Sequence, residues 1–280
     1  MTRLITLGLI QMTVSDDREV NLSKALTMIE EAAKKGAQLV CLPEIFTTPY
    51  FPKEKKSSVK PEKIPGPTTN FLSRAAKNSN VVIVGGSIFE IDGKRRYNTS
   101  TVFDQNGRIL GKYRKVHIPE DEGFYEQDYF SSGTEYKVFK TSFAKIAPLI
   151  CFDQWYPEPV RASRILGADV VVYPTAIGAI SGIQQSEGDW REAWEAVQRG
   201  HAIANSVIVA TVNRVGREKD TEFWGGSFVY NQFGKLLARA AKDKEQVLVV
   251  ECDLDLGKHV EQGWGFMRNR KPRTYSKLVR

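Results

Sequence analysis

Three side chains of different chemical types stand where stretches rich in apolar residues end. Cys151 follows an apolar run, residues 143–150, and leads directly into the polar turn F-D-Q-W-Y-P-E. Glu44 lies in L-P-E-I-F, and Lys115 lies in Y-R-K-V-H-I-P-E. A thiol, a carboxylate and an ammonium are the nucleophile, the base and the oxyanion-stabilising cation that acyl transfer requires.

The position of Cys151 predicts a nucleophile on a strand-to-helix turn, where a helix N-terminus can favour the thiolate. The alternative is a buried cysteine that ends a core strand, the commonest fate of a free cysteine. Position alone leaves both open. A Cys–His mechanism would need His117, His201 or His259 beside Cys151 and is the weaker interpretation. His201 is expected to be packed in a helix.

The elements that must position these residues follow from hydrophobic periodicity. Apolar runs predict buried strands over 4–10, 38–42, 81–89, 100–103, 144–150, 170–173, 207–212, 227–230 and 247–251. Helical spacing predicts helices over 22–33, 71–76, 157–166 and 190–204. Turn sequences at 104–107 and 231–234 predict hairpins. This pattern indicates an α/β protein with helices packed on mixed sheets.

Composition narrows the class of protein. The 280 residues, of which 41% are hydrophobic and 26% charged, suit one domain over 1–280. The apolar start is too short for a membrane span and lacks a signal cleavage region, so we expect a cytoplasmic chain without a membrane partner.

The charge and the cysteines exclude further classes. The formal charge of +7 comes from scattered basic residues, so we expect a solvated surface and no nucleic-acid partner. The cysteines, Cys41, Cys151 and Cys252, are an odd number and far apart. This spacing argues against both a disulfide framework and a zinc site. We expect no metal and no organic cofactor.

The motifs around Glu44, Lys115 and Cys151 together resemble the nitrilase superfamily of carbon–nitrogen hydrolases. The likeness runs from G-L-I-Q-M near the start to W-G-G-S-F at 224–228. Within the superfamily the chain is most similar to the N-carbamoylputrescine amidase group. The segments that carry this match are G-F-Y-E-Q-D-Y-F at 123–130, C-F-D-Q-W-Y-P-E at 151–158, Y-P-T-A-I-G at 173–178 and R-G-H-A-I-A-N at 199–205.

The resemblance implies a four-layer α-β-β-α sandwich that forms a homo-oligomer, a dimer or a larger assembly such as an octamer. We expect the tail, residues 264–280, to lie at a subunit contact. By the same resemblance Cys151 is the nucleophile, Glu44 the general base, Lys115 the oxyanion cation, and Glu126 a second glutamate that holds the site. Each has an alternative: Glu44 could cap a loop, Lys115 could be a surface cation, and Glu126 could pair with a lysine.

The implied reaction is hydrolysis of N-carbamoylputrescine to putrescine, carbon dioxide and ammonia, a step of polyamine biosynthesis. The expected pocket wall is Tyr50, Phe124, Phe152, Trp155, Ile177 and Trp194. Residues 179–182 lack the acid that the group places there to bind the distal ammonium; Glu187, Asp189 and residues 120–122 are the substitutes. The alternatives are an N-carbamoyl amino acid, as for a β-ureidopropionase, an aliphatic amide, or a non-catalytic binding protein of this fold.

Overall fold

The structure, a computed structural model, describes residues 2–183 and 186–279. Its first half is built on parallel strands that alternate with helices. The order is β1 (Leu4–Gln11), α1 (Arg18–Lys34), β2 (Leu39–Cys41), α2 (Pro67–Ser79) and β3 (Val82–Val84). Leu7 pairs with Leu39 and Leu39 with Val82, so the strands run side by side in sequence order. Short helical crossovers between parallel strands produce this arrangement.

The second half repeats the pattern. Its order is β10 (Lys145–Pro148), a 3-10 turn (Cys151–Trp155), α3 (Pro157–Ile165), β11 (Val170–Thr175), α4 (Trp190–Asn205) and β13 (Ile208–Asn213). β10, β11 and β13 are also parallel neighbours. The helices predicted over 22–33, 71–76, 157–166 and 190–204 are confirmed.

Antiparallel strands extend each parallel core into a mixed sheet. The first sheet has the order β18-β1-β2-β3-β5-β4, with β6 on β5; its added strands are β4 (Ile88–Asp92), β5 (Arg95–Phe103), β6 (Ile109–Arg114) and β18 (Gln246–Asp253). The second has the order β17-β16-β13-β11-β10-β9, adding β9 (Phe139–Lys140), β16 (Phe228–Tyr230) and β17 (Leu236–Arg239). The hairpins predicted at 104–107 and 231–234 are confirmed, because they join β5 to β6 and β16 to β17.

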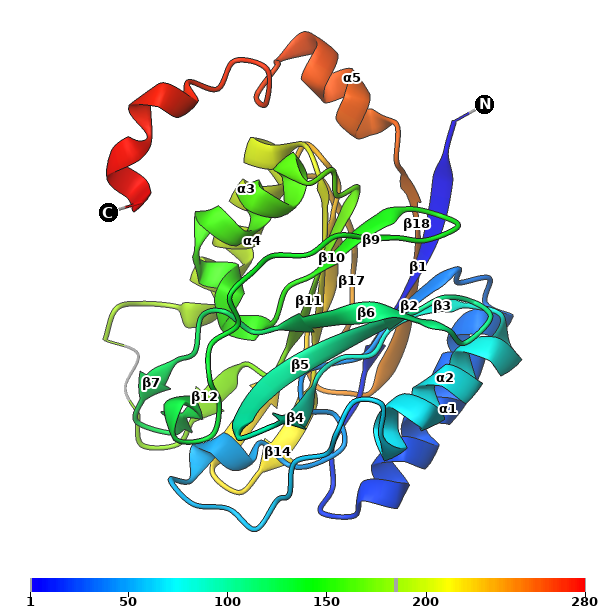
Figure 1. The fold of residues 1–280 in the computed structure, drawn as a ribbon, viewed down its shortest axis with the longest axis vertical. Helices are drawn as coiled ribbons and strands as arrows, with labels where there is room; N and C mark the ends of the chain where they lie inside the picture. Colours follow the sequence, from blue (N-terminus) through cyan, green and yellow to red (C-terminus); the bar gives the residue numbers. More distant parts are fainter. Residues whose placement is uncertain (1, 184–185, 280) are drawn as a thin grey trace.

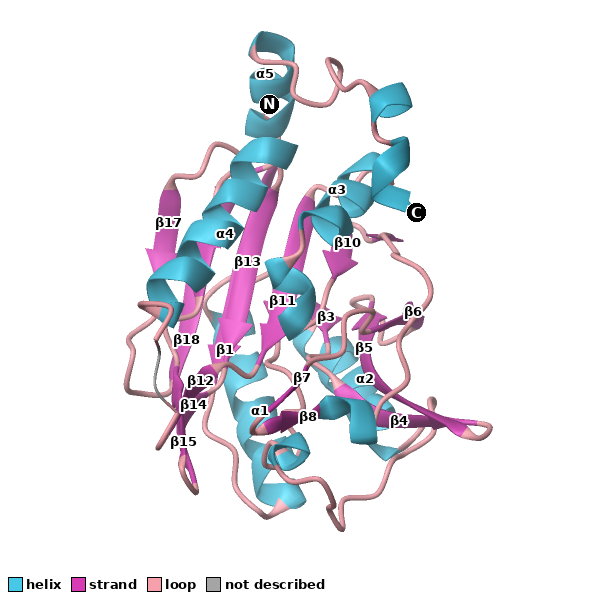
Figure 2. Ribbon diagram, turned by 90° about the vertical axis from the view of Figure 1, so that its left-hand side faces the viewer, coloured by secondary structure: helices cyan, strands magenta, loops and turns pink. Residues whose placement is uncertain are grey.

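The two sheets pack face to face, and helices cover their outer faces (Figures 1 and 2). Side chains of both sheets, such as Leu7 and Val172, share the core between them. α1 and α2 bury Ala32 and Leu72 against the first sheet. α3 and α4 bury Val160 and Ala202 against the second. This is the predicted four-layer α-β-β-α sandwich.

The predicted strand over 81–89 is wrong in one respect, because it is two strands. The chain breaks between β3 and β4 at Gly86, where φ is +57°. A Cβ on Gly86 would lie 2.1 Å from the carbonyl oxygen of Pro43. Glycine therefore allows the segment that carries Glu44 to pass close to this corner.

Several small elements lie outside the sequence predictions. They are the sheet of β12 (Gly178–Ile180), β14 (Val215–Glu218) and β15 (Thr221–Trp224), the hairpin of β7 (Glu120–Asp121) and β8 (Phe124–Tyr125), helix α5 (Leu256–Gly263), and 3-10 turns at Phe51–Lys53, Glu126–Asp128, Pro272–Thr274 and Ser276–Val279. In Figure 1, α5 and the residues after it form an arm that extends beyond the sheets. No helix in the described part of the chain has the length and apolar character needed to cross a membrane.

Candidate active site

A cavity of about 420 Å³ opens beside the end of β10 and contains Cys151. Of the predicted wall residues, Tyr50, Phe124, Phe152, Trp155 and Ile177 line it. Glu126 also reaches the cavity, whereas Glu44 and Lys115 lie fully buried behind it. The fold thus brings together four residues that are far apart in the sequence.

Trp194 lies elsewhere. Its side chain is fully buried in the core between α4 and the second sheet, and its Nε1 donates to Gln154 Oε1 at 2.9 Å. The tryptophan of α4 that lines the cavity is Trp190, at the first turn of the helix. One turn of helix separates the two residues, and Trp190 rather than the predicted Trp194 lines the cavity.

Lys115 is held between two carboxylates. Its Nζ lies 3.0 Å from Glu44 Oε1 and 2.8 Å from both carboxylate oxygens of Glu126. Tyr50 donates its hydroxyl to Glu126 Oε1 at 2.7 Å, and Asn98 Nδ2 donates to Glu44 Oε1 at 2.8 Å. All five side chains are buried, so each charge is compensated by a direct partner rather than by water.

The electrostatics of this cluster set the protonation states. Burial alone would lower the pKa of Lys115, but Glu126 and Glu44 outweigh it and raise that pKa. Lys115 therefore stays an ammonium. Burial raises the pKa of Glu126, while Lys115 opposes the rise. Burial and then the charge of Glu44 raise the pKa of the Cys151 thiol well above its usual range, against the pull of Lys115. A neutral thiol beside a carboxylate needs a general base to become a nucleophile.

Glu44 lies in a segment that we call the base loop, residues 43–50, which follows β2. Ile45 has φ of +46°, a conformation that a β-branched residue rarely adopts. The Ile45 amide donates to Ser87 Oγ at 3.1 Å, and the Ala176 amide donates to Glu44 Oε2 at 3.1 Å. The second oxygen of Glu44 is thus tied to the strand end of the other sheet.

Cys151 opens a segment that we call the nucleophile turn, residues 150–156. Its own φ is +40°, so the candidate nucleophile sits on strained backbone. The buried carboxylate of Asp153 accepts from the amides of Ile150 and His117, each at 3.0 Å, and from the Tyr113 hydroxyl at 2.7 Å. The structure has the predicted strand-to-helix turn: a 3-10 turn (Cys151–Trp155) joins β10 to α3, which begins at Pro157, so Cys151 itself lies before the helix N-terminus.

The histidines are engaged away from the thiol. His117 Nδ1 lies 2.8 Å from Asp153 Oδ1, and its ring stacks on Tyr156 with centroids 3.8 Å apart. His201 is buried and its Nε2 lies 2.9 Å from the carbonyl oxygen of Gln154. These positions match the expectation that neither histidine pairs with Cys151. The described side chains also form no cluster of three or more His, Cys, Asp or Glu that could hold a metal ion.

Acidic side chains stand at the rim of the cavity. Glu120 and Asp121, from β7, and Glu187, which precedes α4, line it and are all exposed to solvent. Trp190 Nε1 donates to Glu187 Oε2 at 3.0 Å, and this hydrogen bond lowers the pKa of Glu187. Asp189 instead caps α4 by accepting from the amides of Arg191 and Glu192. The cavity therefore has a buried end with a thiol, a lysine and two glutamates, apolar walls and a negatively charged rim.

Sequence reasoning missed the side chains that support the site from behind. Asn98, Asp153 and Arg214 are fully buried and polar, and each bonds to the base loop or the nucleophile turn. Asp153, two residues after Cys151, was visible in the motif. Asn98 and Arg214 carried no local signal, since their partners lie far away in the chain.

Comparison with known proteins agrees with this arrangement. The sequence profile of the carbon-nitrogen hydrolase family matches residues 6–262. An N-carbamoylputrescine amidase of Solanum lycopersicum is 39% identical and is aligned over 99% of this chain and 95% of its own. A citrullinase of Francisella tularensis is 33% identical over 99% of this chain and 98% of its own.

A solved structure extends the likeness to the fold. The carbon-nitrogen hydrolase of Helicobacter pylori G27 superimposes with a TM-score of 0.94 at 34% identity, over 100% of this chain and 99% of that one. Sequence and fold therefore agree along the whole length. The chain belongs to the carbon-nitrogen hydrolase family.

Proposed function

We propose that this chain hydrolyses N-carbamoylputrescine to putrescine, carbon dioxide and ammonia, with Cys151 as the nucleophile. The observation that supports this substrate is the lining of the cavity: apolar walls lead from Cys151 to the exposed carboxylates of Glu120, Asp121 and Glu187. Apolar walls suit a chain of methylene groups, and acids at the rim suit the ammonium at its end. The relative from Solanum lycopersicum, named N-carbamoylputrescine amidase, supports the same choice.

In the proposed mechanism Glu44 removes the proton of the Cys151 thiol as the sulfur attacks the carbamoyl carbon. The raised pKa of that thiol is the reason a base is needed. Lys115 and the amide of Phe152 meet the negative oxygen of the tetrahedral intermediate; losing one such donor typically costs about 3 kcal/mol of transition-state stabilisation. Glu126 keeps Lys115 charged and in place through its two contacts of 2.8 Å.

Collapse of the intermediate breaks the bond between the carbonyl carbon and the substituted nitrogen. Glu44 returns its proton to that nitrogen, and putrescine leaves. Glu44 then activates a water, which attacks the carbamoyl thioester and releases Cys151. The carbamate produced decomposes to carbon dioxide and ammonia. We place this reaction in polyamine biosynthesis and in the cytoplasm.

We also propose that one domain forms the protomer and that residues 264–280 lie at a contact between copies of this chain, in a dimer or a larger assembly. Trp264 and Leu278 support this assignment, because their exposures are 63% and 70%. The rings of Phe233 and Trp264 lie 5.8 Å apart, so an apolar surface continues from the sandwich into the arm.

Ammonia release from a substrate panel tests the proposed function. The panel is N-carbamoylputrescine, L-citrulline, N-carbamoyl-β-alanine, an N-carbamoyl-D-amino acid and hexanamide, each with wild type and Cys151→Ala. We expect the highest kcat/KM with N-carbamoylputrescine and no turnover by Cys151→Ala. L-citrulline adds only an α-carboxylate at the distal end, which the acidic rim should repel. A preference for N-carbamoyl-β-alanine or hexanamide would contradict the proposed substrate.

Rim variants make the test sharper. In Glu187→Gln and Glu120→Gln we expect KM for N-carbamoylputrescine to rise, by about fivefold each because exposed ion pairs contribute about 1 kcal/mol. Turnover of hexanamide should be unchanged, since that substrate has no ammonium. Glu122→Gln, on the same hairpin but outside the cavity lining, is the matched control. Equal effects on both substrates would exclude ammonium recognition by the rim.

A further inference from the structure

A buried arginine, Arg214, binds the backbone of the base loop, whereas Lys115 contacts the Glu44 side chain. Arg214 follows β13 directly, and its side chain is fully buried. Its Nη2 donates to the backbone carbonyl oxygens of Glu44 at 2.8 Å, Ile45 at 2.7 Å and Thr48 at 3.4 Å. One guanidinium therefore gathers the carbonyls on both sides of the strained residue in the loop.

The charge of Arg214 is neutralised by Glu218. Arg214 Nη1 pairs with Glu218 Oε1, and Glu218 Oε2 accepts from the amide of Tyr50 at 2.7 Å. The two residues together thus hold the beginning and the end of the base loop. The Arg214 guanidinium also lies over the ring of Phe223, 5.0 Å from its centroid.

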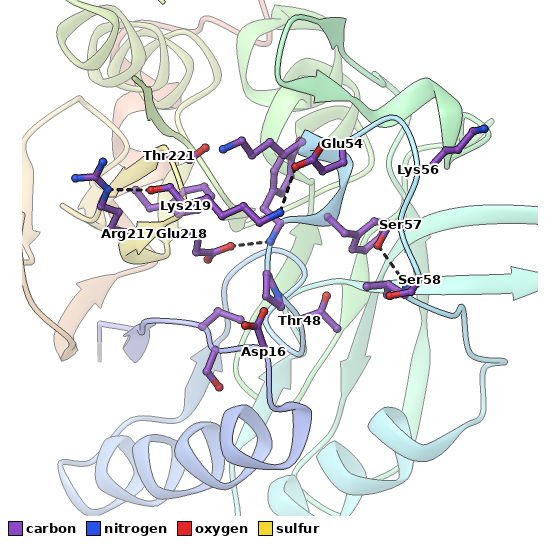
Figure 3. Close-up of a pocket in the computed structure, with 18 residues that line it drawn as sticks. Asp16, Thr48, Glu54, Lys56, Ser57, Ser58, Arg217, Glu218, Lys219 and Thr221 are labelled. Atoms are coloured by element: carbon purple, nitrogen blue, oxygen red, sulfur yellow. Dashed lines mark hydrogen bonds and ion pairs between the residues drawn. The ribbon is translucent and has the colours of Figure 1, made fainter. Parts of the chain in front are cut away.

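Glu218 lies at the edge of a second cavity, of about 730 Å³, on the other side of Tyr50 from the catalytic one. Figure 3 shows its carboxylate turned toward the chain that follows Thr48. From Tyr50 the connection continues to the catalytic cluster, because the Tyr50 hydroxyl donates to Glu126 Oε1 at 2.7 Å. Glu218 therefore reaches Lys115 through two hydrogen bonds and one ion pair.

We propose that Arg214 and Glu218 are positioning residues for catalysis. They hold the base loop in the conformation that keeps the Glu44 carboxylate against Lys115 and beside Cys151, and they fix Tyr50 on Glu126. The strained φ of Ile45 is the conformation that would relax without them. The inference rests on the proposed roles of Glu44 and Cys151, but it does not depend on which substrate is hydrolysed.

The side-chain chemistry explains why this position needs arginine. The guanidinium is planar and its donors diverge in a rigid fork, so it can meet the Glu218 carboxylate with one nitrogen and several carbonyls with the other. A lysine ammonium is a single point on a flexible stem. It can reach Glu218 or the carbonyls, but it holds both groups less well.

A purely structural role is the competing explanation, because breaking a buried ion pair destabilises most folds. The two explanations differ in the activity of the molecules that remain folded. A structural role lowers the fraction of folded protein and leaves kcat per active site unchanged. A positioning role lowers kcat per active site while KM, which reflects the cavity walls, changes little.

The experiment compares Arg214→Lys, Glu218→Gln and the matched control Arg217→Lys, an exposed substitution on β14, the strand that carries Glu218. Active sites are counted from the amount of Cys151 that iodoacetamide alkylates in a sample of each variant. The turnover of untreated enzyme divided by that count gives kcat per active site. We expect kcat to fall about 50-fold in Arg214→Lys and about tenfold in Glu218→Gln, with KM within about threefold of wild type, because the base would be displaced while the cavity walls stay in place. The control should match wild type.

A second readout needs no turnover. The pH midpoint of Cys151 alkylation should move to lower pH in Arg214→Lys, since the Glu44 carboxylate raises the pKa of the thiol and would be held less closely beside it. If Arg214→Lys fails to fold, Glu218→Gln still tests the proposal, because it keeps the arginine and its carbonyl contacts. Unchanged kcat per labelled site together with unchanged alkylation would overturn the proposal. A wild type that alkylates normally but hydrolyses no panel substrate would overturn the proposed function instead.

Discussion

The base loop and the nucleophile turn both contain strained backbone, and buried charges of opposite sign hold the two segments. Each follows a parallel strand, and each contains a non-glycine residue with positive φ, Ile45 at +46° and Cys151 at +40°. The base loop is held by a buried cation, Arg214, that binds its carbonyl oxygens. The nucleophile turn contains a buried anion, Asp153, that accepts from the Ile150 amide within the turn and from the His117 amide outside it.

The difference shows how the reactive groups stay available. In both segments the anchoring group binds the backbone, so it does not occupy the carboxylate of Glu44 or the thiol of Cys151. The anchors are compensated differently. Glu218 supplies a full countercharge to Arg214, whereas Asp153 depends on hydrogen-bond donors and on His117. The nucleophile turn should therefore be the more sensitive of the two to loss of its anchor.

Asp153→Asn should produce the largest effect outside the catalytic groups. One carboxylate oxygen of Asp153 accepts from Ile150 and Tyr113, and the other accepts from two nitrogens of His117. An asparagine keeps one acceptor oxygen, and its NH2 group would face one of these two pairs of donors. We expect kcat/KM to fall about 100-fold and the free energy of unfolding to fall by about 2–3 kcal/mol, because buried donors lose a charged partner. Ammonia release and urea unfolding measure the two quantities.

The exposed substitution Asp243→Asn is the control for that experiment. It should leave kcat/KM unchanged and should change the free energy of unfolding by no more than about 0.5 kcal/mol, the usual range for surface positions. Activity of Asp153→Asn within threefold of wild type would mean that the turn keeps its strained conformation without the anion. The comparison between the two anchors would then be wrong.

Gly86→Ala perturbs the base loop without touching a charged group. The added Cβ would lie 2.1 Å from the Pro43 carbonyl oxygen, at a φ of +57°. We expect the free energy of unfolding to fall by about 2–4 kcal/mol, a range typical of backbone strain combined with steric overlap, and kcat to fall as residues 43–45 move. Urea unfolding and kcat per labelled active site give the two values.

Gly93→Ala is the matched control for Gly86→Ala. Gly93 has a similar φ of +60°, but a Cβ added there would have no described atom within 4 Å outside its chain neighbours. It should lose only the conformational term, about 1 kcal/mol, with full activity. Equal losses in both variants would show that the close approach to Pro43 has no role.

The sequence predicted the parts of this molecule that depend on local pattern. Alternating apolar runs and helical spacing identified the strands and helices of both halves, because each signal lies within one element. Glu44, Lys115 and Cys151 could be recognised because each follows an apolar stretch and each has a motif around it. Five of the six predicted wall residues line the cavity.

The remainder depended on tertiary contacts. Trp190 and Trp194 have the same type and the same helix, and only packing against the second sheet decides which one faces the cavity. Arg214 meets Glu44 across 170 positions of the chain, through a pairing that no local pattern encodes. The acids of the rim were named from the sequence as candidates, but which of them line the cavity depends on the tertiary placement of β7, a two-residue strand too short to give a periodic signal.

The smallest expected effect concerns the charges of Glu44 and Lys115 near the Cys151 thiol. Burial and then Glu44 raise the pKa of Cys151, and Lys115 lowers it. Removing the carboxylate in Glu44→Gln should therefore move the midpoint of Cys151 alkylation to lower pH, and removing the ammonium in Lys115→Met should move it to higher pH. Alkylation rates across a pH series, read by mass spectrometry of the Cys151 peptide, give the midpoints; buried Cys41 and Cys252 report unfolding. Both midpoints can be measured although both variants lose hydrolysis, because alkylation requires only the thiol. The two shifts therefore report the effect of each charge on the thiol independently of turnover. A midpoint that rises in Glu44→Gln would mean that the base loop does not place its carboxylate beside the thiol.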